Sequence, residues 1–172
     1  MRRLLERDAL WSQALRLEDG RGLLRTAAAV LAHSGDSWFW GLGLLAAAAA
    51  GSPEVRLVAW RSLAAIGGLA AVVLTIKLLI RRRRPEGEWG AIYRTTDPHS
   101  FPSGHAARAV LLAVLALAWG PVWLAATLIV WAPLVALARV AMGLHFLSDV
   151  VGGALLGLVA GGVTLAIVSA LG

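Results

Sequence analysis

Two long stretches of the chain carry no charged residue. They cover residues 109–138 and 150–172 and consist mainly of alanine, leucine, valine and glycine. A helix of a soluble domain keeps a polar face toward water, so helices without such a face are expected to contact lipid or one another. The pattern therefore predicts an all-α integral membrane protein.

Turn residues divide the apolar sequence into about five predicted transmembrane helices. Breaks occur at Gly51-Ser52-Pro53, Arg84-Pro85, Gly120-Pro121 and Gly143, because proline forces the preceding residue out of helical geometry and glycine commonly ends a helix. Residues 85–101 are polar and are predicted to form a loop. The predicted helices cover residues 37–50, 55–80, 102–119, 121–142 and, from about 145, the rest of the chain.

The first 35 residues have a different pattern. Leu4, Leu5, Leu15 and Trp11 lie among arginines in residues 2–17, which predicts an amphipathic helix on the membrane surface. The apolar run 23–32 is too short to cross, since about 20 residues are needed to span the bilayer core. We therefore expect one domain, 1–172, with interfacial helices in 1–35 and a helical bundle in 36–172.

Charge narrows the class of partner. Of the 16 basic residues, 14 lie in the first 25 residues, in 77–94 or at Arg108 and Arg139, and the net charge is +6. These positions interrupt apolar helices at their ends, whereas a nucleic-acid surface would be hydrophilic, so we expect anionic lipid headgroups and no nucleic acid. The absence of cysteine excludes disulfides, thiolate metal sites and a cysteine nucleophile.

Ionisable residues of several predicted helices are expected to meet at one membrane face. The ends of the second and fourth helices and the starts of the third and fifth all lie on that side. Charged groups at membrane depth are costly and therefore usually functional. We expect a site between residues 77 and 149, formed by Lys77, Arg84, Ser103, Gly104, His105, Arg139, His145 and Asp149.

Each group suits a phosphate site. Pro102, predicted at the first helical position, would leave the amides of Ser103, Gly104 and His105 pointing at an anion. The cations Lys77, Arg84 and Arg139 would balance a phosphate dianion and the added charge of its transition state.

Two histidines are the candidates for chemistry. His145 and Asp149 are four residues apart, so on a helix the carboxylate would hold the Nδ1 proton and leave Nε2 as nucleophile or base. His105, on another helix, would be free to protonate a leaving oxygen. Spacing alone does not distinguish a catalytic pair from a buried pair that only satisfies its own hydrogen bonds.

Three motifs combine these residues. They are lysine, six residues and Arg-Pro at Lys77 to Pro85; Pro-Ser-Gly-His at residues 102–105; and arginine, five residues, histidine, three residues and aspartate at Arg139, His145 and Asp149. In this order the chain resembles the type 2 phosphatidic acid phosphatase family, whose superfamily includes bacterial acid phosphatases, glucose-6-phosphatase and vanadium haloperoxidases. The resemblance covers about residues 74–149, and one departure is Ala138, where the family commonly has serine.

The resemblance implies a metal-independent lipid phosphatase. His145, supported by Asp149, would form a phosphohistidine, and His105 would protonate the leaving group. Lys77, Arg84, Ser103, Gly104 and Arg139 would bind phosphoryl oxygens. The expected substrate is a polyprenyl phosphate or diphosphate, phosphatidylglycerol phosphate or phosphatidic acid, with polyprenyl compounds ranked first.

Other functions remain as alternatives. The strongest is a phospholipid-binding or translocating protein of this fold without turnover, although transporters usually show broken helices or repeated halves and this chain shows neither. A haloperoxidase fits less well, because those enzymes are larger and soluble.

Several other residues have simpler interpretations. Arg81, Arg82 and Arg83 are predicted to anchor the protein at headgroups, and Arg108 is a further candidate for holding phosphate. His33 and Asp36 are expected to be polar caps of the first span, and His99 a loop residue. Gly153, Gly157 and Gly161 predict close helix packing, and the glycine-rich last helix also suggests a homo-oligomer contact.

The charge distribution bears on orientation. Five helices would place the N-terminal segment and 14 of the 16 basic residues on the face of the motifs. The positive-inside rule then favours a cytoplasmic active site in the cell (inner) membrane. Many family members face outward instead, and several of these cations belong to the site itself, so both orientations stay open.

Overall fold

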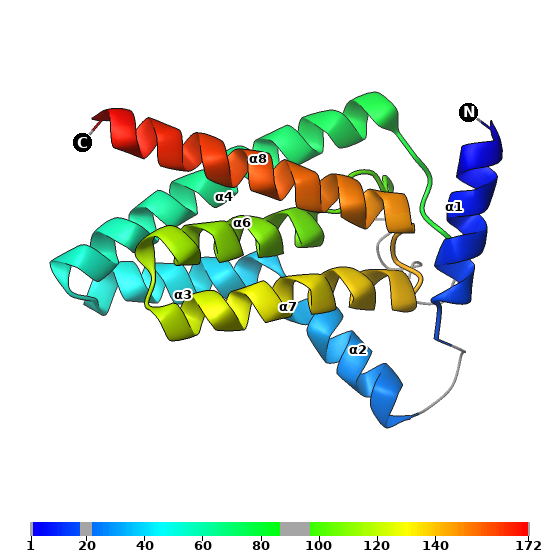
Figure 1. Ribbon diagram of the computed structural model, residues 1–172, viewed down its shortest axis with the longest axis horizontal. Helices are drawn as coiled ribbons and strands as arrows, with labels where there is room; N and C mark the ends of the chain where they lie inside the picture. Colours follow the sequence, from blue (N-terminus) through cyan, green and yellow to red (C-terminus); the bar gives the residue numbers. More distant parts are fainter. Residues whose placement is uncertain (1, 18–21, 87–96, 172) are drawn as a thin grey trace.

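Helices form the regular structure of the protein. The computed structural model describes residues 2–17, 22–86 and 97–171, so 87–96 of the predicted polar loop lie outside the described residues. Apart from one isolated bridge between Arg83 and His99, the described segments show only helices as regular structure (Figure 1), which confirms the all-α class. The helices are α1 (Arg2–Ala14), α2 (Leu23–Ser34), α3 (Ser37–Ala50), α4 (Pro53–Ile80), α6 (Gly104–Trp119), α7 (Val122–Ala141) and α8 (Leu147–Leu171).

Most helix ends follow local sequence signals. At the start of α4, the Ser52 hydroxyl accepts a hydrogen bond from the amide of Val55 (3.4 Å), and Pro53 occupies the first turn. α4 ends at Arg81, which adopts the left-handed conformation, and α7 is followed by Gly143 with φ +65°. Two predicted starts were wrong: the third apolar helix begins at Gly104 instead of Pro102, and the last begins at Leu147 instead of about 145.

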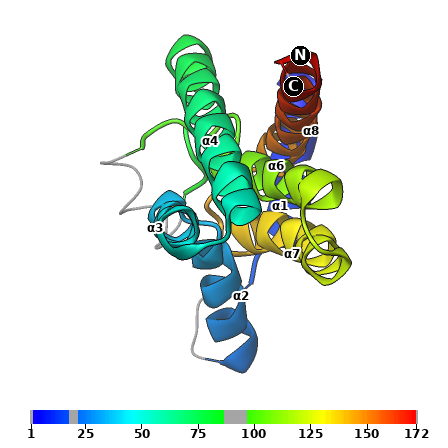
Figure 2. The same cartoon turned by 90° about the vertical axis from the view of Figure 1, so that its left-hand side faces the viewer.

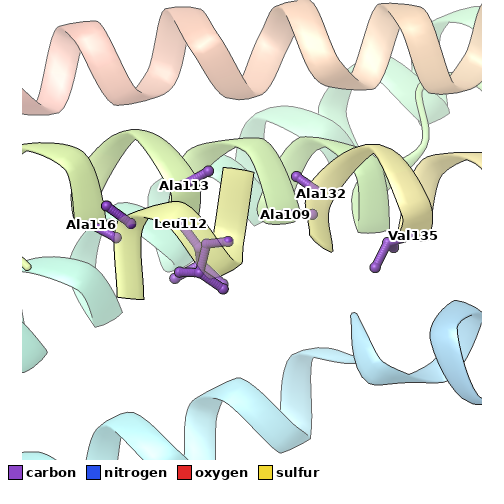
Figure 3. Packing of buried hydrophobic residues seen from close by; sticks show 8 residues of the cluster. Ala109, Leu112, Ala113, Ala116, Ala132 and Val135 are labelled. Atoms are coloured by element: carbon purple, nitrogen blue, oxygen red, sulfur yellow. The ribbon is translucent and has the colours of Figure 1, made fainter. Parts of the chain in front are cut away.

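The centre of the bundle is α6. Figure 2 shows it among α4, α7 and α8, and most of its residues are buried, many of them alanine. Small side chains let helix backbones approach closely. Figure 3 shows part of the resulting core, in which residues of α6 pack against α7; its members are Ala109, Leu112, Ala113, Ala116, Ala125, Leu128, Ala132 and Val135.

The glycine stripe of α8 packs against α6. Gly153, Gly157 and Gly161 are buried, and a Cβ at residue 153 or 157 would collide with the main-chain oxygen of Ser103 or Ala107. This confirms the predicted close packing. These three glycines are thus in contact with α6 of the same chain, and a homo-oligomer contact through the last helix stays a prediction.

Three helices are long and apolar enough to cross a membrane: α4, α7 and α8. α3 and α6 are also apolar but have only 14 and 16 residues. Large apolar side chains are exposed on these helices, for example Leu42 of α3 and Leu158 and Val159 of α8, as expected for lipid contact. The protein is therefore a multi-pass membrane protein, and the number of five spans stays a prediction.

The N-terminal helices lie at one end of the bundle. Figure 1 shows α1 running across that end, and its side chains Leu5, Trp11 and Leu15 are exposed. α2 packs Ala28 and Ala32 against the end of α7. The segment in which no motif was recognised thus contacts the end of the bundle that carries the motifs.

Candidate active site

The predicted convergence of the motifs is confirmed. The ends of α4 and α7 and the starts of α6 and α8 lie together at the end of the bundle next to α1 (Figure 1). A cavity of about 280 Å³ opens there. One side is polar, and the other is an apolar wall from α4 with Ser37 of α3; the lining residues are Lys77, Asp97, Gly104, His105, Arg108 and His145, and Ile66, Leu69, Ala70, Val73 and Leu74.

His145 lies in the turn between α7 and α8. The main-chain oxygen of Arg139 accepts hydrogen bonds from the amides of Leu144 (3.0 Å) and His145 (3.3 Å), which fixes this turn. The imidazole is 1% exposed. Burial lowers the pKa of His145 well below its ordinary value, and nearby cations, Arg139 first among them, act in the same direction. The ring is therefore neutral and keeps the lone pair that a nucleophile needs.

The contacts of His145 define its tautomer. Nε2 lies 3.1 Å from Nη1 of Arg84, and a guanidinium can only donate, so Nε2 is the acceptor. The ring proton then belongs on Nδ1, which faces Oδ2 of Asp149 at 3.6 Å. This distance is within ion-pair range but too long for a hydrogen bond. His145 and Asp149 are therefore adjacent, as their spacing predicted, but the expected hydrogen bond between them is absent from this structure.

Arg84 and Lys77 share one carboxylate. The Arg84 guanidinium donates to the main-chain oxygens of Leu144 (2.8 Å) and Asp97 (2.7 Å) and to Oδ2 of Asp97 (2.7 Å). Lys77 Nζ is also paired with that carboxylate. Asp97 was missed by the sequence analysis, because an acidic residue in a loop has no periodicity or motif. Its carboxylate lies between the two cations that the sequence predicted to bind phosphoryl oxygens.

Removing this carboxylate should favour anion binding. We expect Asp97→Asn to lower the inhibition constant of inorganic phosphate several-fold, since one carboxylate no longer competes for Lys77 and Arg84. Product inhibition of phosphate release measures it. Glu86→Gln is the control, because Glu86 is an exposed carboxylate residue close to the same site. An unchanged or higher constant in Asp97→Asn would contradict competition between Asp97 and phosphate.

His105 is held by a second aspartate that sequence reasoning misassigned. Its Nε2 lies 2.7 Å from Oδ1 of Asp36, so the ring is not free as predicted. The hydrogen bond with His105 is the main cause that lowers the pKa of Asp36 to about 2. Asp36 does occupy the cap position of α3, but its side chain makes no capping hydrogen bond. The prediction of a simple helix cap was therefore wrong for the Asp36 side chain.

The start of α6 differs from the predicted anion site in one respect. Ser103 is the cap residue: its hydroxyl accepts from the amide of Ala106 (3.4 Å), and its own amide donates to the main-chain oxygen of Asp149 (2.9 Å). The Ser103 amide is therefore not available to an anion. The amides of Gly104 and His105, which have no acceptor within the helix, make no hydrogen bond to other described residues.

Two buried arginines connect the site to α2. Arg139 is fully buried and donates to the main-chain oxygen of Ala32 (3.5 Å). Arg108 donates to the main-chain oxygen of Gly35 and also lines the cavity. The position of Arg108 is consistent with the predicted accessory role in holding phosphate.

The arginine run before Pro85 divides into two kinds of residue. Arg81 and Arg83 are exposed, as expected for headgroup anchors. Arg82 instead has a side chain only 17% exposed and pairs with Oδ1 of Asp149 at 2.8 Å. The headgroup interpretation was therefore wrong for Arg82, because the chain turns at Arg81 and directs the next side chain inward.

Comparisons with known proteins agree with this geometry. The family model of the PAP2 superfamily matches residues 58–172. A decaprenylphosphoryl-5-phosphoribose phosphatase from Mycolicibacterium smegmatis is 35% identical over 136 residues, which cover 78% of this chain and 73% of that protein.

Two crystal structures share the fold. A transmembrane PAP2 type phosphatidylglycerolphosphate phosphatase from Bacillus subtilis has a TM-score of 0.75 and 23% identity, covering 100% of this chain and 89% of that one. LpxE from Aquifex aeolicus has a TM-score of 0.70 and 24% identity, covering 94% of each chain. With three motifs gathered around one cavity and a family model matched over residues 58–172, the chain belongs to the PAP2 superfamily.

Proposed function

We propose that this protein is a lipid phosphatase in which His145 is the nucleophile. One observation carries the proposal: His145, the cations Lys77 and Arg108 and the N-terminus of α6 line one end of a cavity whose other wall is apolar. The polar end suits a phosphate group and the apolar wall suits a lipid chain. The family assignment supports the same reaction class, hydrolysis of a phosphoric ester.

The first chemical step follows from the positions of the two histidines. Nε2 of His145 forms a bond to phosphorus while the bond from phosphorus to the lipid oxygen breaks. His105 enters this step as an imidazolium: Asp36 accepts from its Nε2–H, and the Nδ1 proton is the one transferred to the lipid oxygen. Lys77, Arg84 and the amides of Gly104 and His105 stabilise the charge of the transition state.

The second step restores the enzyme. The oxygen of a water molecule forms a bond to phosphorus while the bond from phosphorus to Nε2 of His145 breaks, one proton of the water passes to Nδ1 of His105, and inorganic phosphate leaves. Asp149, with Nδ1 of His145 opposite its Oδ2, compensates the positive charge that the imidazole carries in the intermediate. All groups in this scheme are side chains or amides of the protein, and we propose that hydrolysis needs no metal ion.

The substrate class is a lipid phosphate, and we rank polyprenyl phosphates or diphosphates first. The wall from Ile66 to Leu74 spans about 12 Å along α4 at the rise of an α-helix, which is enough to contact the first part of a chain but not its end. The relative from M. smegmatis is a phosphatase of a decaprenylphosphoryl compound. Phosphatidylglycerol phosphate and phosphatidic acid are the other candidates, and a phosphate-release panel across purified lipid phosphates with EDTA would order them.

Blocking the apolar wall should distinguish lipid from soluble substrates. Ala70 and Ala71 are both exposed, but only Ala70 lines the cavity. We expect Ala70→Trp to lower kcat/KM for a long-chain lipid phosphate at least about tenfold, because the indole occupies the space of the chain, and to leave a short soluble phosphate ester little affected. Ala71→Trp is the matched control. Equal losses on both substrates would argue against a lipid chain on this wall.

A binding or translocating protein without turnover is the second candidate. It would use the same cations and the same apolar wall. Phosphate release that depends on His145 would exclude it, whereas tight lipid phosphate binding without release by the wild type would favour it.

We propose further that the site faces the cytoplasm from the cell (inner) membrane. The positive-inside rule supports this side, and the chain has no cysteine, so single cysteines can report topology. Glu86 is exposed beside the site and Ser52 is exposed at the opposite end of α4. In intact cells an impermeant thiol reagent should label Ser52→Cys and spare Glu86→Cys; the reverse pattern would place the site outside.

A further inference from the structure

Helix α1 has a polar side that faces the bundle. Asp8 and Ser12 are buried, with 7% and 6% exposure, whereas Leu5, Leu10 and Trp11 of the same helix are exposed. An acidic residue is rarely buried unless it is paired. The partners of Asp8 and Ser12 therefore indicate what α1 contributes to the rest of the molecule.

These two residues cap the first turn of α8. Oδ1 of Asp8 accepts a hydrogen bond from the amide of Ser148 (3.0 Å), and the hydroxyl of Ser12 accepts one from the amide of Leu147 (2.8 Å). Such amides have no acceptor within their own helix. Ser12 also donates to the main-chain oxygen of Asp8 (2.6 Å). α1 thus supplies from outside the cap that α8 would otherwise need from its own residues.

The second carboxylate oxygen of Asp8 contacts residues next to the active site. Oδ2 accepts from the hydroxyl of Ser148 and from Nη2 of Arg82, both at 2.6 Å. Burial raises the pKa of Asp8, but hydrogen bonds from Ser148 and Arg82 outweigh it and lower the pKa overall. Asp8 is therefore ionised and forms a buried pair with the Arg82 guanidinium.

Arg82 also contacts Asp149, the residue that faces the proposed nucleophile His145. Its Nη1 donates to Oδ1 of Asp149 (2.8 Å), and the guanidinium lies over the ring of Phe146 at 4.1 Å. The other oxygen of Asp149 accepts from the amide of Phe146 (2.8 Å) and is the one that faces Nδ1 of His145. Both oxygens of Asp149 thus have protein partners, and one of these partners, Arg82, is itself held by α1.

We infer that Asp8 and Ser12 are positioning residues for the hydrolysis, and that Asp8 acts through Arg82 on Asp149. The inference rests on the proposed function. If Asp8 loses its charge, one of the two carboxylates paired with the Arg82 guanidinium no longer compensates its positive charge. Asp149 and the first turn of α8 can then shift. Nucleophilic attack depends on placement to within a fraction of an ångström, and a displacement of about 1 Å can cost about a hundredfold in rate.

The test compares two carboxylates of the same helix. Asp8→Asn keeps the shape of the side chain and removes its charge, and Glu6→Gln makes the same change at an exposed position of α1. We expect Asp8→Asn to lower kcat at least about tenfold and to leave KM and the inhibition constant of phosphate nearly unchanged, because Lys77 and Arg84 are untouched. Glu6→Gln should behave like the wild type.

A double-variant cycle tests the route through Arg82. If Asp8 acts through Arg82, then Asp8→Asn should cause little further loss of kcat in an Arg82→Gln background. Losses that add, or an Asp8→Asn enzyme with the kcat of Glu6→Gln, would overturn the inference while leaving the phosphatase assignment intact. A wild-type protein that releases no phosphate from any lipid phosphate would overturn the proposed function itself, and the positioning role with it.

Ser12→Ala provides a second, milder variant in case Asp8→Asn does not fold. It leaves the ion pair of Asp8 and removes the acceptor of the Leu147 amide. We expect a several-fold lower kcat with unchanged KM. A Ser12→Ala enzyme with wild-type kcat would contradict the role assigned to Ser12 and, without a folded Asp8→Asn variant, the inference as a whole.

Discussion

Replacing His145 by alanine is expected to abolish phosphate release from lipid phosphates. The variant lacks the atom that bonds to phosphorus, so we expect a loss of at least about 10³-fold in kcat, typical for removal of a nucleophile. The measurement is release of inorganic phosphate by purified protein in detergent, in the presence of EDTA. Lipid phosphate binding should persist, because the Lys77 and Arg84 side chains remain.

His99→Ala is the control for this change. His99 is a partly exposed loop histidine at the same end of the molecule, and its removal should leave kcat close to that of the wild type. Turnover retained by the His145→Ala protein would contradict the proposed mechanism.

Replacing Arg84 by alanine is expected to have the second largest effect. Its guanidinium contacts Nε2 of His145 and the main-chain oxygen of Leu144, and it would also neutralise charge on the phosphoryl oxygens. We expect kcat/KM to fall about 10²- to 10³-fold, as for removal of one transition-state donor. Arg84→Lys should recover little, because lysine cannot reproduce the planar set of donors.

The neighbouring Arg83 offers a matched control. Its side chain is exposed, so Arg83→Ala removes the same charge from the same segment without touching the site, and activity should stay within about twofold because surface charges interact weakly across solvent. Similar losses in both variants would indicate a general effect of membrane-surface charge, and would argue against a specific role for Arg84.

The sequence predicted the helices and the meeting of the motifs because both depend on short-range signals. Proline and glycine mark the end of α6 and the start of α7 at Gly120-Pro121. The spacing of His145 and Asp149 predicts adjacency on one helical face. The two residues do lie adjacent, although His145 is in the turn before α8 and the pair is 3.6 Å apart.

The partners of the site could not be predicted in the same way. Asp36, Asp97 and Asp8 each reach a motif residue through tertiary contacts, across 69, 20 and 74 positions of the sequence for the pairs with His105, Lys77 and Arg82. No periodicity or local spacing encodes such a contact. A single acidic residue near the membrane surface has the same sequence pattern whether it is solvated or buried.

Arg81, Arg82 and Arg83 illustrate the limit most clearly. The three residues are identical in type and consecutive, and the sequence predicts one role for all of them. The left-handed backbone of Arg81, with φ 51°, ends α4 and decides which side chain turns inward. Only Arg82 of the three then reaches Asp149 among the described contacts.

Trapping the covalent intermediate tests the central claim most directly. Purified protein would be mixed with a lipid phosphate, quenched within milliseconds in alkali, where phosphohistidine is stable, and digested for peptide mass spectrometry. We predict a phosphoryl group on His145 of the wild type, and none in the His145→Ala protein. Phosphate release without a phosphorylated enzyme, or a phosphoryl group on another residue, would contradict the account.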